Sequence, residues 1–127
     1  MRHTTWLVDG QEYKLRLGVS DVMSLEKRLG RNPMDLLMGI QQGKLPTLTA
    51  SLAVIQAAMT KFHHGITAQD VIRIYERYVD AGNSYTDLLP VITEIFEVSG
   101  FFKSDPVIET EDTQTLDLME PENDPIP

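Results

Sequence analysis

The sequence predicts a mainly α-helical domain that begins with a β-hairpin and ends in an acidic tail. Apolar residues alternate near the N-terminus and recur at helical spacing from Ser20 onward. The net charge of −8 comes entirely from residues 104–127, whereas residues 1–103 are electrically balanced. We therefore expect one helical domain at 1–103. The tail at 104–127 should be disordered, because its few apolar residues cannot offset the entropy lost on ordering.

The first expected element is a hairpin around Asp9 and Gly10. Both central residues of a type I′ turn need positive φ, which the Asp-Gly pair tolerates well. The strand residues that should face the core are Trp6, Val8, Tyr13, Leu15 and Leu17. Because an isolated hairpin is only marginally stable, we expect this apolar side to lie on the helices.

Two helices are expected between Ser20 and Gly43. Ser20 is the predicted N-cap of the first helix, and Gly30 should end it in the left-handed conformation. Asn32 should cap the second helix, with Pro33 at the first helical position, where its missing N–H costs no hydrogen bond. The core residues expected from this pair are Val22, Leu25, Leu29, Met34, Leu37 and Met38.

The third helix should begin after Thr47 and stop at Gly65. Its expected core stripe is Leu48, Leu52, Ile55, Met59 and Phe62. A second side carries Ala50, Ala53, Val54, Ala57 and Ala58, and a helix that is apolar nearly all round is buried on more than one side. This helix is therefore either the central helix of the bundle or one that also contacts another subunit or a client.

Two further helices complete the domain, and each begins with a capping box. Thr67 with Asp70 starts one, and Ser84 with Asp87 starts the other. Pro90 lies several residues into the last helix and should kink it or delay its start, because proline donates no backbone hydrogen bond. Their expected core residues are Val71, Ile74, Tyr75, Tyr78, Leu88, Val91, Ile92, Ile95 and Phe96.

Composition argues against several classes of protein. The chain has no cysteine, which excludes disulfide frameworks, thiol catalysis and cysteine-based zinc sites. No apolar run approaches the ~20 residues of a membrane-spanning helix, and the N-terminus lacks the apolar stretch of a secretory signal. There is no basic surface for gripping phosphates. We therefore expect a cytoplasmic protein that binds neither membranes nor nucleic acid.

The sequence also lacks the patterns typical of active sites. His63 and His64 are adjacent, so on a helix they point about 100° apart and cannot share a metal ion. Glu94 and Glu97 share a helix face but have no candidate base or nucleophile nearby. No nucleophile elbow, phosphate-binding loop, dinucleotide fingerprint or HExxH motif occurs. We predict no enzyme activity, no metal and no cofactor.

Three segments resemble the tail assembly chaperones of long-tailed bacteriophages of Gram-positive hosts. They read GRNPMDLLMG (30–39), KFHHGITAQDVIRIYERYVDAG (61–82) and SYTDLLPVITEIFEVSGFFK (84–103), within a similarity that extends from about Thr5 to Lys103. The resemblance implies a non-enzymatic chaperone of a phage or prophage, acting in the host cytoplasm. Such a chaperone binds the tape measure protein and keeps it soluble while tail tube protein polymerises around it.

The candidate partner-binding residues are Ala50, Ala57, Phe101 and Phe102. The alanines allow close approach of another helix. A hydrophobic contact beyond the glycine at position 100 explains one of the two phenylalanines, which leaves the other free for a partner.

Two other functions stay open at the level of sequence. The chain is a candidate structural component of a phage tail or head, which predicts a homo-oligomer retained in the virion. It is also a candidate helical regulator whose acidic tail occupies a basic site. The tail itself is a linker, a docking strip around Leu116, Leu118 and Met119, or a mimic of nucleic acid.

Overall fold

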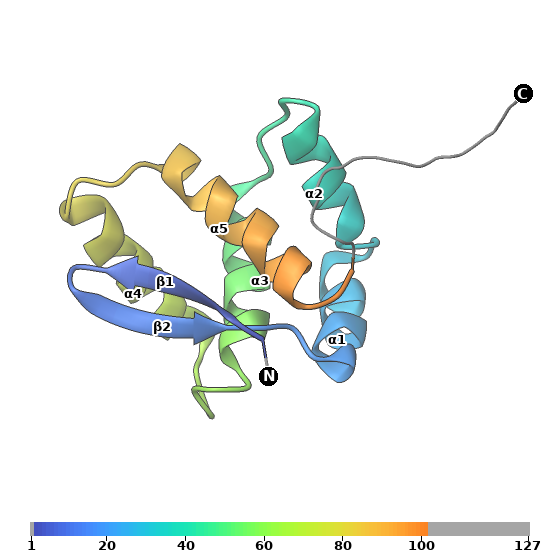
Figure 1. Ribbon diagram of the computed structural model, residues 1–127, viewed down its shortest axis with the longest axis horizontal. Coiled ribbons are helices and arrows are strands. Elements are labelled where there is room, and N and C mark those ends of the chain that lie inside the picture. The colour runs from blue at the N-terminus through green and yellow to red at the C-terminus, as the bar shows by residue number, and fades with distance from the viewer. Residues whose placement is uncertain (1, 102–127) are drawn as a thin grey trace, which may run out of the picture.

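The computed structural model describes residues 2–101, which form a β-hairpin followed by five helices (Figure 1). The elements are β1 (Thr4–Val8), β2 (Gln11–Leu15), α1 (Val19–Leu29), α2 (Met34–Gln41), α3 (Leu48–Met59), α4 (Ala68–Asp80) and α5 (Tyr85–Val98). The predicted fold class, mainly α with an N-terminal hairpin, is confirmed. The predicted acidic tail at 104–127 lies outside the described residues.

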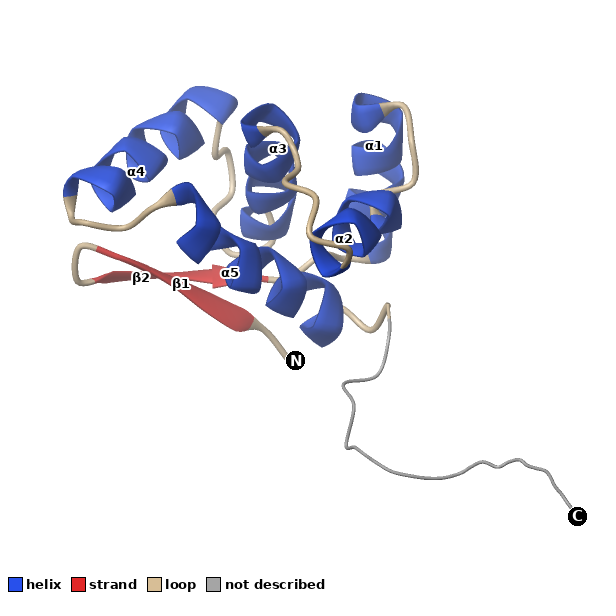
Figure 2. Ribbon diagram, turned by 90° about the horizontal axis from the view of Figure 1, so that it is seen from above, coloured by secondary structure: helices blue, strands red, loops and turns tan. Residues whose placement is uncertain are grey.

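The hairpin has the turn and the orientation that its sequence predicts. Asp9 and Gly10 adopt φ values of 50° and 82°, and Trp6 pairs with Tyr13 across the antiparallel strands. Figure 2 shows the hairpin along one side of the helices. Its alternate side chains are buried against them, and the Trp6 ring lies 5.3 Å from the ring of Tyr78 in α4. The hairpin is thus held in place by the helical core.

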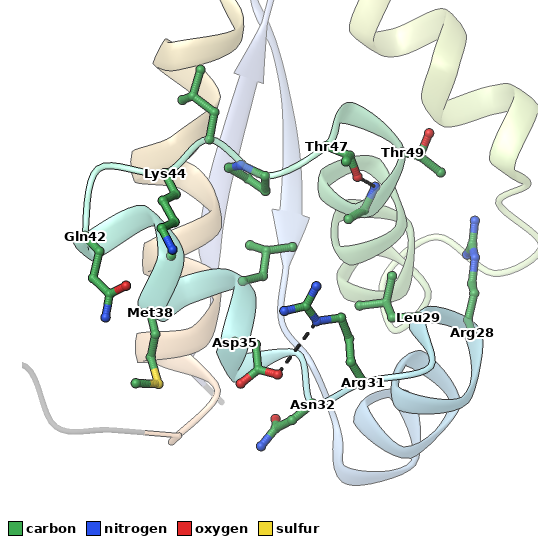
Figure 3. A pocket seen from close by; sticks show the side chains of 15 residues that line it. Arg28, Leu29, Arg31, Asn32, Asp35, Met38, Gln42, Lys44, Thr47 and Thr49 are labelled. Carbon is green, nitrogen blue, oxygen red and sulfur yellow. Dashed lines mark hydrogen bonds and ion pairs between the residues drawn. The ribbon is translucent and has the colours of Figure 1, made fainter.

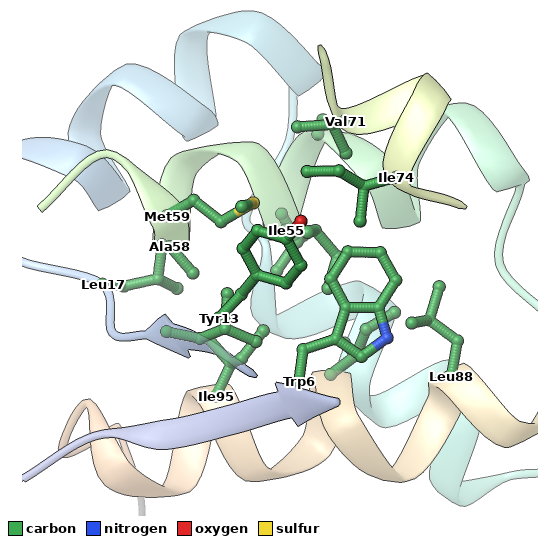
Figure 4. Packing of buried hydrophobic residues seen from close by; sticks show 14 of the residues in the cluster. Trp6, Tyr13, Leu17, Ile55, Ala58, Met59, Val71, Ile74, Leu88 and Ile95 are labelled. Atoms are coloured by element: carbon green, nitrogen blue, oxygen red, sulfur yellow. The ribbon is translucent and has the colours of Figure 1, made fainter. Parts of the chain in front are cut away.

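The central element is α3, which packs against α1, α4, α5 and β2 (Figure 1). Its buried residues are Ser51, Ala53, Val54, Ile55, Ala58 and Met59. Figure 4 shows side chains of the hairpin, α3, α4 and α5 meeting in one cluster. The central position of α3 therefore explains why it is apolar on two sides.

Several helix ends follow the predicted local chemistry. Thr47 caps α3, and capping boxes begin α4 and α5. At the end of α5, Gly100 has a φ of 88°, its N–H donates to the Glu97 carbonyl, and the Phe101 N–H donates to the Phe96 carbonyl. This is the hydrogen-bond pattern of a Schellman motif, in which the residue after the glycine packs back on the helix.

The beginning of α1 and the end of α3 differ from prediction. Gly18, not Ser20, precedes α1, and its N–H donates to the Asp21 carboxylate at 2.9 Å, which is the N3 half of a capping box. The helix α3 stops at Met59 and does not reach Gly65. The N–H groups of residues 62 and 63 both turn back to the Met59 carbonyl, which tightens the chain before Gly65.

The expectations for Leu48 and Pro90 can also be compared with the structure. Leu48 is 42% exposed, because α3 turns its Ala53–Val54 side as well as Ile55 toward the core and leaves its first residue at the surface. Of the two alternatives for Pro90, the delayed start is excluded, since Pro90 lies inside α5 and the capping box at Ser84 fixes the first turn at Tyr85. None of the helices within residues 2–101 is long and apolar enough to cross a membrane.

Candidate partner-binding groove

A groove of about 700 Å³ lies beside α2, between the end of α1, the connection at 42–47 and the first turn of α3 (Figure 3). Its walls come from consecutive parts of the chain. The groove therefore depends on how the chain turns between α1 and α2, and again between α2 and α3.

The corner between α1 and α2 is built by local hydrogen bonds. Gly30 adopts the left-handed conformation, and its N–H donates to the Glu26 carbonyl. The Asn32 side chain then accepts from the Met34 N–H at 3.0 Å. Pro33 has helical dihedral angles but stands at the N-cap, so α2 begins one residue later than predicted. These contacts turn the chain from the end of α1 into the start of α2, and both of these helix ends line the groove.

The opposite corner brings the chain back to α3. Gly43 has a φ of 83°, and the Lys44 N–H donates to the Gly39 carbonyl at 2.8 Å. Thr47 then caps α3 by accepting from the Ala50 N–H at 3.1 Å. The hydroxyl of Tyr85, the first residue of α5, donates to the Pro46 carbonyl at 2.6 Å. This bond fixes the connection between α2 and α3 to α5.

The lining of the groove combines apolar and polar side chains. The apolar lining residues are Leu29, Leu36, Met38, Leu45, Pro46 and Ala50. Two of them are more than half exposed, Met38 at 52% and Leu45 at 60%. Large apolar side chains that gather in a hollow are typical of a surface that binds another apolar group.

The rim of the groove carries an excess of positive charge. Arg28, Arg31 and Lys44 lie along it, with Asp35 as the acidic residue among its lining. The Arg31 Nε atom lies 3.7 Å from an Asp35 carboxylate oxygen (Figure 3), and Arg28 donates to the Gln56 side chain at 2.7 Å. Both members of the ion pair are well exposed, so the pair is weak and both side chains can turn toward a ligand.

The structure separates the predicted partner-binding residues. Ala50 lines the groove, whereas Ala57, two turns along α3, lines a smaller hollow of about 210 Å³ against α1. Phe101 lies at the end of α5, where its ring packs 5.9 Å from that of Phe96. Phe102 lies outside the described residues. Of the four, Ala50 therefore lies in the groove.

Sequence reasoning missed the two most exposed apolar residues of the groove. Leu37 and Met38 were both expected in the core, but Leu37 is buried whereas Met38 is 52% exposed, because their side chains point about 100° apart on α2 and Met38 lies on the solvent side. Leu45 lies in a connection, where no periodicity marks its role. Its one signal is a large apolar residue between Lys44 and a helix-starting Pro-Thr pair.

A second hollow, of about 620 Å³, lies beside α4 and has a different character. Its two basic side chains are already engaged: Arg73 pairs with Asp70 at 3.0 Å, and Arg77 donates to the Tyr13 hydroxyl at 2.5 Å. The Thr67 N–H donates to the Asp70 carboxylate, and this bond holds the pKa of Asp70 below its ordinary value, with help from the Thr67 hydroxyl and Arg73. The second hollow is therefore a weaker candidate for binding.

His63 and Glu94, which the sequence analysis considered for chemistry, contact the N-terminal hairpin. The His63 ring lies 5.5 Å from the Tyr13 ring, and its buried Nε2 atom has no partner within residues 2–101. Glu94 accepts a hydrogen bond from the Thr4 hydroxyl, which ties α5 to β1. Across the described part of the chain, no three His, Asp or Glu side chains are grouped so that they could hold a metal ion.

Comparison with known proteins gives a family and no activity. A model described as "Family of unknown function (DUF6096)" matches residues 2–124, which include the helical domain and most of the acidic segment. No curated protein and no solved structure matches the chain.

Proposed function

We propose that this chain, which belongs to the DUF6096 family, is a non-enzymatic tail assembly chaperone of a long-tailed phage or prophage. In this role it binds helical segments of the tape measure protein and keeps them soluble while tail tube protein assembles around them. The groove beside α2, with Met38 and Leu45 exposed inside a concave surface, is the observation that carries the proposal. The resemblance of segments 30–39, 61–82 and 84–103 to such chaperones supplies the identity of the client.

The groove has the properties that binding of an amphipathic helix requires. Such a helix presents apolar side chains at intervals of three and four residues and lays them into an apolar groove. Met38 suits varied client sequences, because its unbranched thioether side chain adapts to different partners. The small Ala50 on the facing wall leaves room for the backbone of the client to approach α3.

The charge of the chain suits a chaperone that holds its client temporarily. Only a few exposed apolar side chains line the groove, so binding to any one segment is expected to be weak and reversible. The net charge of −8 makes complexes repel one another and keeps them dispersed.

Co-expression with the long helical protein encoded beside this chain tests the proposal. The soluble fraction of that client, and its retention on the tagged full-length chain, are the two readouts. The groove variant is Leu45→Glu, and the matched control is Met23→Glu, because Leu45 and Met23 are 60% and 58% exposed and Met23 lies on α1 outside the groove lining. Circular dichroism verifies that both variants remain folded.

We expect the wild type and Met23→Glu to hold the client soluble, whereas Leu45→Glu should retain about tenfold less client, since a charge replaces a buried apolar contact. An insoluble, unbound client with the wild type contradicts the chaperone function. A soluble client that Leu45→Glu retains as well as the control does contradicts the groove as the binding site. Retention of the chain in finished particles favours a structural component instead.

A further inference from the structure

The charges of this chain are divided between a strongly acidic end and a basic groove rim. Residues 104–127 contain eight acidic residues and no Lys or Arg. The groove lining holds Arg28, Arg31 and Lys44 against Asp35. The two parts are therefore complementary in charge, and they belong to the same molecule.

The groove is favoured over the second hollow by the sign of its charges. The hollow beside α4 is lined by Asp70, Glu76 and Asp80 together with Arg73 and Arg77, and Arg73 is already paired with Asp70. An acidic segment would meet like charges there. The groove is lined by three basic side chains and one acidic side chain, and its Arg31–Asp35 pair is exposed enough to exchange partners.

The described chain ends beside the start of α1, whose other end lines the groove. Arg16 donates to the Val98 carbonyl at 2.7 Å, and the Leu17 N–H donates to the Ser99 hydroxyl at 2.9 Å, which fixes the end of α5 beside the start of α1. The same helix α5 also packs against α2. The roughly 15 residues from Phe101 to Leu116 can extend on the order of 50 Å, so chain length does not prevent the tail from reaching the groove.

The acidic segment also contains apolar residues suited to the groove floor. Leu116, Leu118 and Met119 alternate with the acidic Asp117 and Glu120. Apolar side chains from such a stretch can contact Met38 and Leu45 while its carboxylates meet the basic rim. Because the segment is tethered, its effective concentration at the groove is in the millimolar range, so weak contacts suffice.

We propose that residues 116–122 of the chain's own tail occupy the groove beside α2 in the free protein, and that any partner of the groove must displace them. The contact is intramolecular and does not depend on which client the groove serves. It makes the acidic segment a competitor for the groove. Removing the contact should therefore raise the affinity of the groove for its partner.

A spin label on the tail of the full-length protein tests the contact directly. The chain has no cysteine, so Thr115→Cys provides a single attachment site for a nitroxide. We expect the NMR signals of the Arg31, Lys44 and Ala50 amides to lose at least half of their intensity. The signals should recover at 0.5 M salt, because the Debye length then falls to about 4 Å.

Charge reversal supplies the specific and the control variants. Arg28→Glu with Arg31→Glu should abolish the broadening at the groove. Lys14→Glu with Lys61→Glu should preserve it, since these exposed residues lie on β2 and after the far end of α3, outside the groove lining. The amide spectrum of each variant verifies its fold. The measurement at 0.5 M salt needs only the Thr115→Cys protein and no charge-reversal variant.

Three outcomes would overturn the proposal. The first is full intensity of the groove amides at low salt. The second is equal broadening over the whole surface, with no response to Arg28→Glu and Arg31→Glu. The third is broadening that passes from a labelled molecule to a separate ¹⁵N-enriched, unlabelled one in a mixed sample, because the occupant would then be the tail of a second copy.

Discussion

The Tyr85 hydroxyl oxygen lies 2.7 Å from the Ser51 hydroxyl oxygen, at the point where α5 begins and α3 passes behind it. Tyr85 has a single hydroxyl proton, which it donates to the Pro46 carbonyl at 2.6 Å, so Ser51 is the donor of the first bond. Ser51 is fully buried within α3. The one tyrosine thus satisfies a polar group in the central helix and anchors a wall of the groove.

Replacing Tyr85 by Phe should lower the free energy of unfolding by about 1–3 kcal/mol, because the buried Ser51 hydroxyl loses its partner. Urea unfolding followed by circular dichroism measures the loss. Adding Ser51→Ala should recover part of it, since no unsatisfied hydroxyl then remains.

Tyr75→Phe is the control for this prediction. Within residues 2–101, the tyrosine hydroxyls that form hydrogen bonds belong to Tyr13 and Tyr85, and Tyr75 is half-buried on α4. We expect its loss to change stability by less than about 0.5 kcal/mol. A Tyr85→Phe variant as stable as this control would show that the hydrogen bonds contribute little.

The features predicted correctly from sequence are those that a few neighbouring residues determine. The Asp9-Gly10 turn, the Thr47 cap and the capping boxes each depend on side chains within three positions of the backbone groups they serve. The start of α1 was missed because Ser20 is a typical cap residue, whereas the helix begins after Gly18, whose N–H donates to the Asp21 carboxylate.

The candidate site was harder to predict, because its exposed residues depend on tertiary packing. Ala50 was identified from the apolar surface of α3 and lies in the groove. Met38 and Leu45 were not, since Leu37 and Met38 were both expected in the core, and only the packing of α2 on α5 shows that Leu37 is buried and Met38 exposed. The basic rim brings together residues from three segments, which no local pattern reveals.

The capping box of α4 predicts a specific pH dependence. Hydrogen bonds from the Thr67 N–H and hydroxyl, and then Arg73, hold the pKa of Asp70 below its ordinary value of 3.8. A carboxyl whose folded pKa is lowered stabilises the fold above its unfolded pKa and loses this contribution as pH falls through the folded pKa. The wild type should therefore melt at a higher temperature than Asp70→Asn at pH 7, and the difference should disappear in acid below the lowered pKa.

Melting curves followed by circular dichroism between pH 2.5 and 7 measure this difference. Asp80→Asn is the control, because Asp80 ends α4 beside the negative end of the helix dipole and its charge should not stabilise the fold. A gap between wild type and Asp70→Asn that stays constant down to pH 2.5 would contradict the assigned role of the carboxylate.

Two glycines should respond in opposite directions to the same substitution. Gly10 has a φ of 82° in the hairpin turn, and a Cβ added there meets nothing within 4 Å, so Gly10→Ala should cost about 1–2 kcal/mol through backbone conformation alone. Gly39 lies inside α2, where an added Cβ makes ordinary contact with Lys44 at 3.8 Å, and Gly39→Ala should stabilise by about 0.5–1 kcal/mol. Chemical denaturation of both variants measures the two changes. If Gly10→Ala proves as stable as wild type, the turn does not require positive φ at this position, and the register that places Trp6 opposite Tyr13 must have another origin.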